Sequence, residues 1–456
     1  MTNRLNNHAR TRHRLGRGLV SVLVAIVAMS LIAVGCGSSS DDSADAGSST
    51  TAAGQKCSGT PTASDSGVTA DAVNVAVPVI NLTGAFTNET FGLRNADDAF
   101  AVAQAIAKDI NANGGVACRQ LNLKLYKVNI LDANQQKATC LDIINDKPFA
   151  VIDIGGFTTP ASRTCLKDAK VLYDASSNGL VNSDELAQWK PYMYMMYPTT
   201  DDAARNFVEG AAAQGVFSPS KGFKKIGLLL TACNKQTNST LTDKLKGAGV
   251  SQSQISVFTF SGCTVNAATE VSQAVQQFKD AGVSHVFLAA STSYGPAFIK
   301  QADTLNFKPT YLTSDEANES RSSAWAPSFD KAIAVTSTHQ GELGGGTIND
   351  ERQACNDAIE KAGAKPATEA KDSMPMSICD TLRLFAAIAN AGDVKLTKDT
   401  FTSRLQKVGA FHSAHLGDAD FRVAGTRSGG QTYRAIQYHV DCTCWKLLDT
   451  AWKKVK

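Results

Sequence analysis

The sequence predicts an α/β protein with two Rossmann-like, doubly wound lobes, and three observations lead to this fold class. Apolar runs that read as strands alternate with helical stretches from Asp71 onward. The same alternation restarts after Pro198, so two units of similar size follow one another. The strand-like runs are nearly continuously apolar, which is typical of parallel sheets covered by helices on both faces.

The first unit begins with an apolar strand at residues 74–80, followed by a polar loop and a long helix. In that helix Ala103, Ile106 and Ile110 recur at helical spacing. An Asn-Gly-Gly sequence at 113–115 is expected to end it. The pattern then predicts a strand at 121–130, a helix at 136–146, a strand at 149–156, a helix at 161–170 and a strand at 171–176.

The second unit has expected strands at 226–232, 255–261, 285–290 and 309–315. The helix between the second and third of these, at about 266–281, carries an apolar stripe at core-packing spacing. The end of the chain does not simply continue this unit and is expected to complete both lobes. It contains a strand at 332–338, helices at 349–362, 374–391 and 398–407, and strands at 433–440 and 444–448.

Residues 1–35 have the form of a secretory signal, with five arginines before an apolar run. Ala33-Val34-Gly35-Cys36 has the form of a bacterial lipobox, in which Cys36 becomes the lipid-bearing first residue of the mature chain. The alternative is an uncleaved membrane helix. Either interpretation places the rest of the chain outside the cytoplasm. Residues 36–56 are rich in Ser, Gly, Asp and Thr, which predicts a flexible tether.

Charge and cysteine content narrow the function further. The chain has 45 basic and 42 acidic residues, and five of the basic ones are the signal arginines, so 40 remain against 42. This near-neutral balance argues against a nucleic-acid partner. Besides Cys36 there are ten cysteines among the 11, an even set that indicates disulfides in an extracytoplasmic protein.

No catalytic motif and no metal-ligand spacing stands out, so the chain is not expected to be an enzyme or to carry a cofactor or metal. The pair His412 and His415 has no evident third ligand in the sequence. Cys442 and Cys444 lack the spacing of a zinc ribbon.

The chain resembles the type I periplasmic binding proteins of the leucine/isoleucine/valine-binding kind, which are the ligand receptors of ABC importers. The likeness rests on the order and spacing of several segments between about 70 and 448. These are the first strand with its Thr-Gly loop, DINANGG, IGGFTTPAS, LYDASSNG, IGLLLTACNKQ and YLTSDEAN.

The resemblance implies two lobes joined by three hinge crossings, with the ligand bound between them. It places the crossings near 195–198, 335–338 and 432–435. Lobe one is then 57–197 plus 339–432, and lobe two is 198–338 plus 433–456. Within this frame we expect three disulfides, Cys140–Cys165, Cys233–Cys263 and Cys355–Cys379, while the pairing of Cys57, Cys118, Cys442 and Cys444 stays open.

Ligands of open α/β sheets bind beyond the carboxyl ends of the strands, often at helix N-termini. In amino-acid-binding members of the family, lobe-one hydroxyls and N–H groups hold the ligand carboxylate, and a lobe-two acid binds the ammonium. The resemblance assigns the hydroxyl pair to Thr158 and Thr159 and the acid to Asp315. Further expected contacts are Ala175, Ser176, Ser177, Asn234 and the aromatic residues Phe91 and Tyr294. Each has a structural alternative as a cap, turn or packing residue.

One departure from the family bears on the ligand. Where amino-acid binders carry an aromatic residue in the first loop of lobe two, this chain has the polar residues 234–238. We therefore expect a more polar or larger ligand than a branched-chain amino acid.

The function implied by the resemblance is a monomeric receptor, lipid-anchored to the outer face of the bacterial cell membrane. It would capture an amino acid, amide or small carboxylate by hinge closure and deliver it to permease and ATPase subunits. Two alternatives stay open: a sensory ligand receptor on the same fold, and a scaffold lipoprotein with a degenerate cleft.

Overall fold

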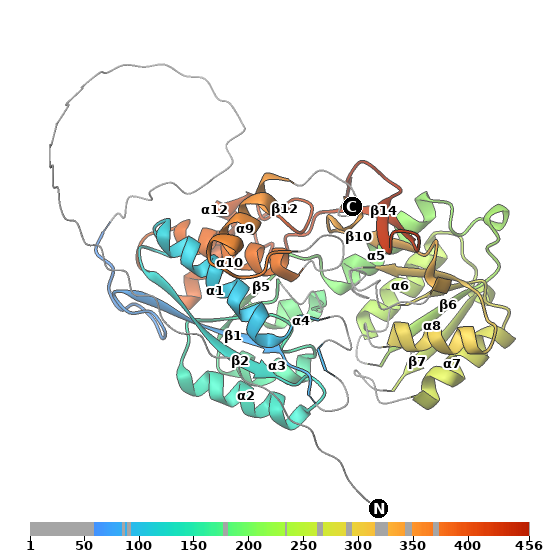
Figure 1. Cartoon of the computed structure of the whole chain (residues 1–456), viewed down its shortest axis with the longest axis horizontal. Coiled ribbons are helices and arrows are strands. Elements are labelled where there is room, and N and C mark those ends of the chain that lie inside the picture. The colour runs from blue at the N-terminus through green and yellow to red at the C-terminus, as the bar shows by residue number, and fades with distance from the viewer. Residues whose placement is uncertain are drawn as a thin grey trace, which may run out of the picture. The chain divides into compact units, whose positions relative to one another are not determined.

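Two separate β-sheets organise the part of the chain that the computed structural model describes. The described residues are 59–83, 87–88, 93–176, 181–232, 235–261, 268–288, 294–314, 327–342, 349–367 and 374–455. The expected signal and tether, residues 1–56, lie outside them. In Figure 1 the strands and helices of each sheet form a group of their own.

The first sheet has five strands in the order β2-β1-β3-β4-β5, and every neighbouring pair is parallel. Its strand order reverses between β1 and β3, the kind of switch point beside which α/β sheets bind ligands. The strands are β1 (Ala72–Ile80), β2 (Gln120–Val128), β3 (Ala150–Ile152), β4 (Leu172–Asp174) and β5 (Met193–Tyr194).

Helices cover both faces of the first sheet. Val75 and Val77 of β1 face a core shared with α1, α9 and α10, whereas Ala76 faces a second core shared with α2 and α3. These opposite faces follow from the two-residue period of a strand. The helices are α1 (Ala96–Ala112), α2 (Ala133–Asp146), α3 (Pro160–Asp168), α4 (Ser183–Gln188), α9 (Asp350–Lys361), α10 (Met374–Asn390), α11 (Lys398–Phe401) and α12 (Leu405–Val408).

The second sheet has eight strands, and its parallel part repeats the order of the first sheet as β7-β6-β8-β9-β10. Its own switch point lies between β6 and β8. Strand β13 adds antiparallel to β10, and β14 and β15 pair with β13. The strands are β6 (Ile226–Thr231), β7 (Ile255–Phe260), β8 (His285–Phe287), β9 (Thr310–Ser314), β10 (Ile333–Thr336), β13 (Thr432–His439), β14 (Cys444–Leu447) and β15 (Lys453–Lys454).

Helices α5 (Thr200–Ala213), α6 (Lys235–Gly247), α7 (Ala268–Asp280) and α8 (Tyr294–Thr304) accompany the second sheet. A small hairpin, β11 (Ala410–Phe411) with β12 (Ala419–Asp420), lies between α12 and β13. The chain end therefore contributes to both groups: buried residues of α9 and α10 belong to the core of the first sheet, and those of β13 and β14 to the second.

The predicted α/β fold class with two parallel sheets is confirmed. Helix α1 ends at Ala112, just before the Asn-Gly-Gly sequence, where Gly115 has a φ of +73°. A Cβ at Gly115 would lie 2.1 Å from the carbonyl oxygen of Arg119, so only glycine fits this turn. The helical stretch expected at 398–407 is present, but it is not one continuous α-helix: it is divided into α11, a 3₁₀ turn at Thr402–Arg404 and α12.

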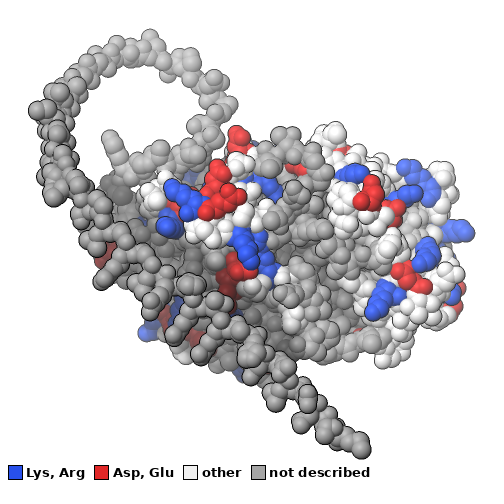
Figure 2. All heavy atoms as spheres, in the orientation of Figure 1, with Lys and Arg blue, Asp and Glu red and all other residues white. Residues whose placement is uncertain are grey.

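Charged side chains of both signs are interspersed on the described surface that Figure 2 shows, with no large patch of one sign. None of the described helices combines the length and apolar character needed to cross a bilayer.

Candidate functional site

The structure describes the side chains of four predicted ligand residues: Thr158, Thr159, Ala175 and Ser176. All four follow the carboxyl ends of β3 and β4 in the first sheet. Tyr294 begins α8, but its side chain is outside the described part. The other predicted contacts also lie outside it: Phe91, Ser177, Asn234 and Asp315.

A buried carboxylate shapes the turn between β3 and α3. Asp153 follows β3 and accepts hydrogen bonds from the N–H of Gly156 (2.7 Å) and of Phe157 (3.3 Å). The phenol of Tyr173 donates a further hydrogen bond to it. Asp153 therefore fixes the backbone that leads to Thr158 and Thr159, at the end of the strand that borders the switch point of the first sheet.

The two adjacent threonines have different surroundings. The Thr159 hydroxyl caps α3 by accepting from the N–H of Ser162 at 3.2 Å. This is the capping role that the sequence analysis gave as the alternative to ligand contact. The Thr158 Oγ1 atom is buried and has no hydrogen-bond partner among the described residues. Buried hydroxyls are rarely left without a partner in folded proteins. Thr158 is thus the member of the pair whose hydroxyl is not engaged by another described residue.

The segment after β4 is tied to the end of β5. The Ser176 hydroxyl accepts from the N–H of Met196 at 2.9 Å, and the N–H of Ala175 donates to the carbonyl of Tyr194 at 3.0 Å. The N–H of Ser176 donates to Asp174 at 2.8 Å. These bonds hold the predicted contact segment in place and occupy the Ser176 hydroxyl, which favours a structural role for that side chain.

Asp174 is buried at the same strand end with one carboxylate oxygen unpartnered among the described residues. Burial raises its pKa to about 7, even though the hydrogen bonds from Ser176 act in the opposite direction. The carboxyl group therefore titrates near neutral pH beside the candidate site.

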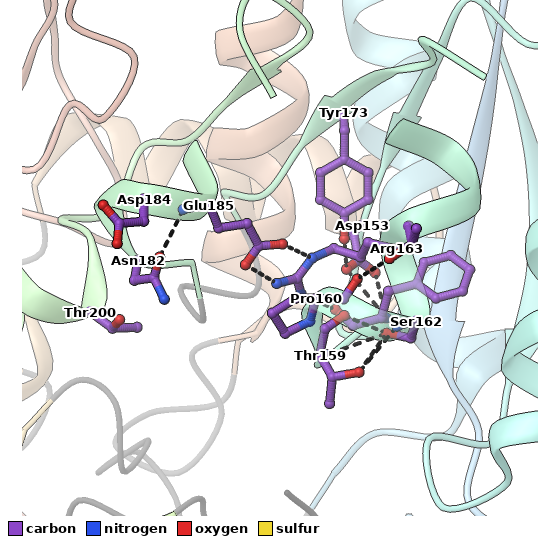
Figure 3. A network of polar contacts seen from close by, with 12 residues as sticks. Asp153, Thr159, Pro160, Ser162, Arg163, Tyr173, Asn182, Asp184, Glu185 and Thr200 are labelled. Atoms are coloured by element: carbon purple, nitrogen blue, oxygen red, sulfur yellow. Dashed lines mark hydrogen bonds and ion pairs between the residues drawn. The ribbon is translucent and has the colours of Figure 1, made fainter. Parts of the chain in front are cut away.

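A buried ion pair supports the β3–α3 turn from α4. Arg163 of α3 binds Glu185 through two hydrogen bonds, of 2.9 Å from Nε and 2.6 Å from Nη2. Its third nitrogen donates to the carbonyl of Phe157 at 2.8 Å. Figure 3 shows this network with Asp153 and Tyr173 close to Arg163. Although burial opposes its charge, the pKa of Arg163 is raised by the Glu185 carboxylate. Sequence reasoning missed this network.

The start of α4 also contacts the helices of the second sheet. The N–H and hydroxyl of Ser183 donate to Asp201 of α5 at 2.8 and 2.7 Å. Gln236 of α6 donates to the Ser183 hydroxyl at 2.9 Å and accepts from the N–H of Asp184 at 3.3 Å.

This arrangement changes the interpretation of the polar loop at 234–238. Besides Gln236, Thr237 pairs with Thr200 at 2.7 Å, and Asn238 donates to the carbonyl of Thr231 at 2.9 Å. Three of the polar side chains are thus engaged with the protein itself. They give no support to the expectation of an especially polar ligand.

The end of β9 places further hydroxyls at the carboxyl edge of the second sheet. Thr313 and Ser314 are fully buried, and their hydroxyls have no partner among the described residues. These positions were not predicted, although they directly precede Asp315 in the sequence.

The described residues contain no group of three potential ligands that could hold a metal ion. His412 is exposed and lies 3.3 Å from Asp418, whereas His415 is buried. Burial lowers the pKa of His415 to about 3, with further lowering by nearby Arg352 and His339. The two histidines therefore occupy separate environments.

Cysteine sulfurs lie at bonding distance in two predicted pairs, Cys140 with Cys165 and Cys355 with Cys379. Their Cα atoms are 6.4 and 6.1 Å apart, which is normal for disulfides. Cys442 and Cys444, left open from sequence, form a further pair. Cys233 and Cys263 lie outside the described residues. Oxidation of these pairs stays a prediction, which mass measurement before and after reduction tests.

A family model described as periplasmic binding protein matches residues 79–441. The chain is similar in structure to a leucine-binding protein from Thermotoga maritima MSB8, with 14% identity and a TM-score of 0.60, covering 83% of this chain and 98% of that one. At 15% identity and a TM-score of 0.62, it is also similar to an ABC transporter solute-binding protein from Rhodopseudomonas palustris BisB5 in complex with 3,4-dihydroxybenzoic acid, over 84% and 98% of the two chains.

A fatty acid ABC transporter substrate-binding protein from Thermomonospora curvata has 14% identity and a TM-score of 0.62, over 85% of this chain and 94% of that one. At such identities the likeness shows the fold alone. The comparison with curated proteins gives no match.

Proposed function

Because the chain belongs to the periplasmic binding protein family and has its type I fold, we propose that it is the lipid-anchored solute receptor of an ABC importer. Family members bind solutes outside the cytoplasm and are not enzymes, so this chain is a solute-binding protein. The finer proposal is that it captures an amino acid, amide or small carboxylate between two hinged lobes. The lobes are those set out in the sequence analysis, 57–197 plus 339–432 and 198–338 plus 433–456.

The observation that carries this proposal is the buried Thr158 hydroxyl beside the start of α3, which has no hydrogen-bond partner in the part of the chain that the structure describes. A hydroxyl donor next to a helix N-terminus suits an anionic oxygen. The three similar proteins are a leucine-binding protein, a solute-binding protein in complex with 3,4-dihydroxybenzoic acid and a fatty acid transporter substrate-binding protein, and all three kinds of compound carry a carboxylate. We therefore favour a carboxylate as the group that the first lobe binds.

Binding is proposed to act through closure. A solute that contacts both lobes stabilises the closed arrangement relative to the open one, and a permease distinguishes the two shapes. The lipid at Cys36 and the tether at 36–56 would keep the receptor beside its permease at the membrane. An N-terminal peptide with acyl-modified Cys36 in the mass spectrum of the mature protein tests the anchor.

Thermal-shift measurements against amino acids, amides, hydroxybenzoates, short carboxylates and fatty acids test the solute proposal. A true ligand at 100 times its Kd stabilises the protein by about 2.7 kcal/mol. We expect one carboxylate-containing class to raise the melting temperature in a saturable way. Stabilisation by none of these classes would contradict the proposal and favour the degenerate-cleft scaffold.

A further inference from the structure

The first turn of α4 is a small polar element that belongs to the first sheet but contacts the helices of the second. It connects β4 to β5, whereas α5 and α6 pack with strands of the second sheet. Ser183 binds Asp201, and Gln236 bridges the Ser183 hydroxyl and the Asp184 N–H. The carbonyl of Val181 adds a bond by accepting from the N–H of Thr200 at 3.0 Å.

The same element is firmly connected to the candidate ligand segment. Glu185, one turn of chain after Asn182, holds Arg163 through two hydrogen bonds, and Arg163 holds the carbonyl of Phe157. Phe157 directly precedes Thr158. Asn182 caps α4 by accepting from the N–H of Glu185 at 2.8 Å, so the turn that carries Ser183 is also fixed. Hydrogen bonds through Arg163, Glu185 and the first turn of α4 therefore connect Phe157, next to Thr158, with Gln236.

We propose that Gln236 and Ser183 form an interlobe lock that holds the receptor in the arrangement seen here, with Arg163 and Glu185 as positioning residues that connect the lock to the ligand segment. This inference rests on the proposed solute-binding function and adds a control of closure to it. The lock contacts no solute itself. It sets how often the free protein adopts the arrangement in which both sheet ends are brought together.

The chemistry favours Gln236 for this role. An amide both donates and accepts, so one side chain can serve the Ser183 hydroxyl and the Asp184 N–H together. Asp201 is buried and already accepts two bonds from Ser183. Losing these two hydrogen bonds, one part-buried and one exposed, is expected to lower the ratio of locked to unlocked molecules about five-fold.

The experiment compares Gln236→Ala with the parent and with Gln276→Ala in the complete mature protein, without any ligand. Gln276 is a matched control because it is an exposed helical glutamine whose side chain donates to Asp280 at 2.8 Å, within α7. Single-amide hydrogen exchange should accelerate at Asp184 more than at Ser183, whose N–H keeps Asp201. Small-angle scattering should show a larger mean radius of gyration. The Gln276→Ala control should match the parent in both.

Unchanged exchange at Asp184 together with unchanged scattering would overturn the lock. So would faster exchange throughout α6, because Gln236 would then support only the local fold. Two substitutions of Ser183 add a second check. Ser183→Thr keeps the hydroxyl and should retain the parent scattering, whereas Ser183→Ala removes it and should behave like Gln236→Ala.

The outcome can be separated from that of the solute proposal. Exchange and scattering are measured on the free protein, so a failed solute screen leaves this result standing, and a failed lock leaves a positive screen standing. For any compound that stabilises the parent, Gln236→Ala is expected to weaken binding by up to about five-fold, because the binding-competent fraction is reduced.

Discussion

The carboxyl ends of the two sheets repeat one strand order but differ in chemistry. At the first sheet, buried charges interlock: Arg163 with Glu185, and Asp153 with the Tyr173 phenol, beside the buried Asp174. At the carboxyl ends of β6 and β9 in the second sheet, the buried polar groups are instead the hydroxyls of Thr231, Thr313 and Ser314. The first end is thus an ionic framework, whereas the ends of β6 and β9 present neutral hydroxyls. The buried charge of the second sheet lies to one side of them, where Arg434 of β13 pairs with the end of β10 and binds Glu342.

This difference suggests that the two sheet ends have different roles in binding a solute. Buried charges are tolerated only when their partners and hydrogen bonds are held in place, so the first end must be rigid. Neutral hydroxyls carry a much smaller desolvation cost and can change partners. We interpret the first end as the preformed platform for a solute and the second as the part that closes over it.

The largest expected effect comes from breaking the ionic framework. Arg163→Met leaves Glu185 buried without its partner and should lower the free energy of unfolding by about 3–5 kcal/mol. Adding Glu185→Leu to the variant should recover most of this loss. Thr313→Val, at the second end, is the contrasting control and should change stability by less than about 1 kcal/mol. Urea unfolding followed by circular dichroism measures all three. A small effect of Arg163→Met alone would remove the contrast between the two ends.

A pH-dependent effect is expected from Asp174. Its pKa is about 7 in the folded protein but near 3.8 in the unfolded chain, so the folded state retains a proton that the unfolded state loses. The resulting stabilisation is complete below about pH 4, declines as the pH rises and is absent above about pH 7. The raised pKa corresponds to roughly 4 kcal/mol in the free energy of unfolding between these two pH limits.

Asp174→Asn removes this titration and isolates it from the other groups. Asp380, whose pKa burial raises to about 6, and His415 titrate in both proteins and cancel in the comparison. The stability of the variant relative to the parent should therefore increase between pH 4 and pH 7.5. A difference that stays constant across this range would show that Asp174 ionises normally in the folded protein.

The smallest expected effect on stability distinguishes the two neighbouring threonines. Thr159→Val removes the cap of α3 and should cost about 1 kcal/mol. Thr158→Val removes a hydroxyl that has no partner among the described side chains and backbone groups, so it should leave stability unchanged or slightly higher while weakening solute binding several-fold. Calorimetric titration with a compound identified by thermal shift measures the affinity. Equal behaviour of both variants would reject the separation of cap from ligand contact.

The sequence predicts elements well where the local pattern is strong. Ile226–Thr231 is an uninterrupted apolar run and forms a fully buried strand, and the Asn-Gly-Gly sequence ends α1 as expected. The interrupted helix at 398–407 shows the limit. There Arg404 is drawn into the core and binds the carbonyls of Ala389 and Lys395, a tertiary effect that helical periodicity cannot reveal.

The candidate site depends more on contacts between distant residues. Arg163 and Glu185 are 22 positions apart, and Ser183 and Gln236 are 53 apart, so no local pattern indicates either pair. Strand ends could be located from the sequence, which is why Thr158 and Thr159 were predicted as candidates. Only the structure distinguishes the capping hydroxyl from the unpartnered one.

The most direct test of solute capture by two closing lobes is small-angle scattering of the mature protein titrated with a stabilising compound from the thermal-shift panel. The account predicts a decrease in the radius of gyration that saturates at one solute per chain, in parallel with the rise in melting temperature. Saturable stabilisation with an unchanged radius of gyration would contradict it.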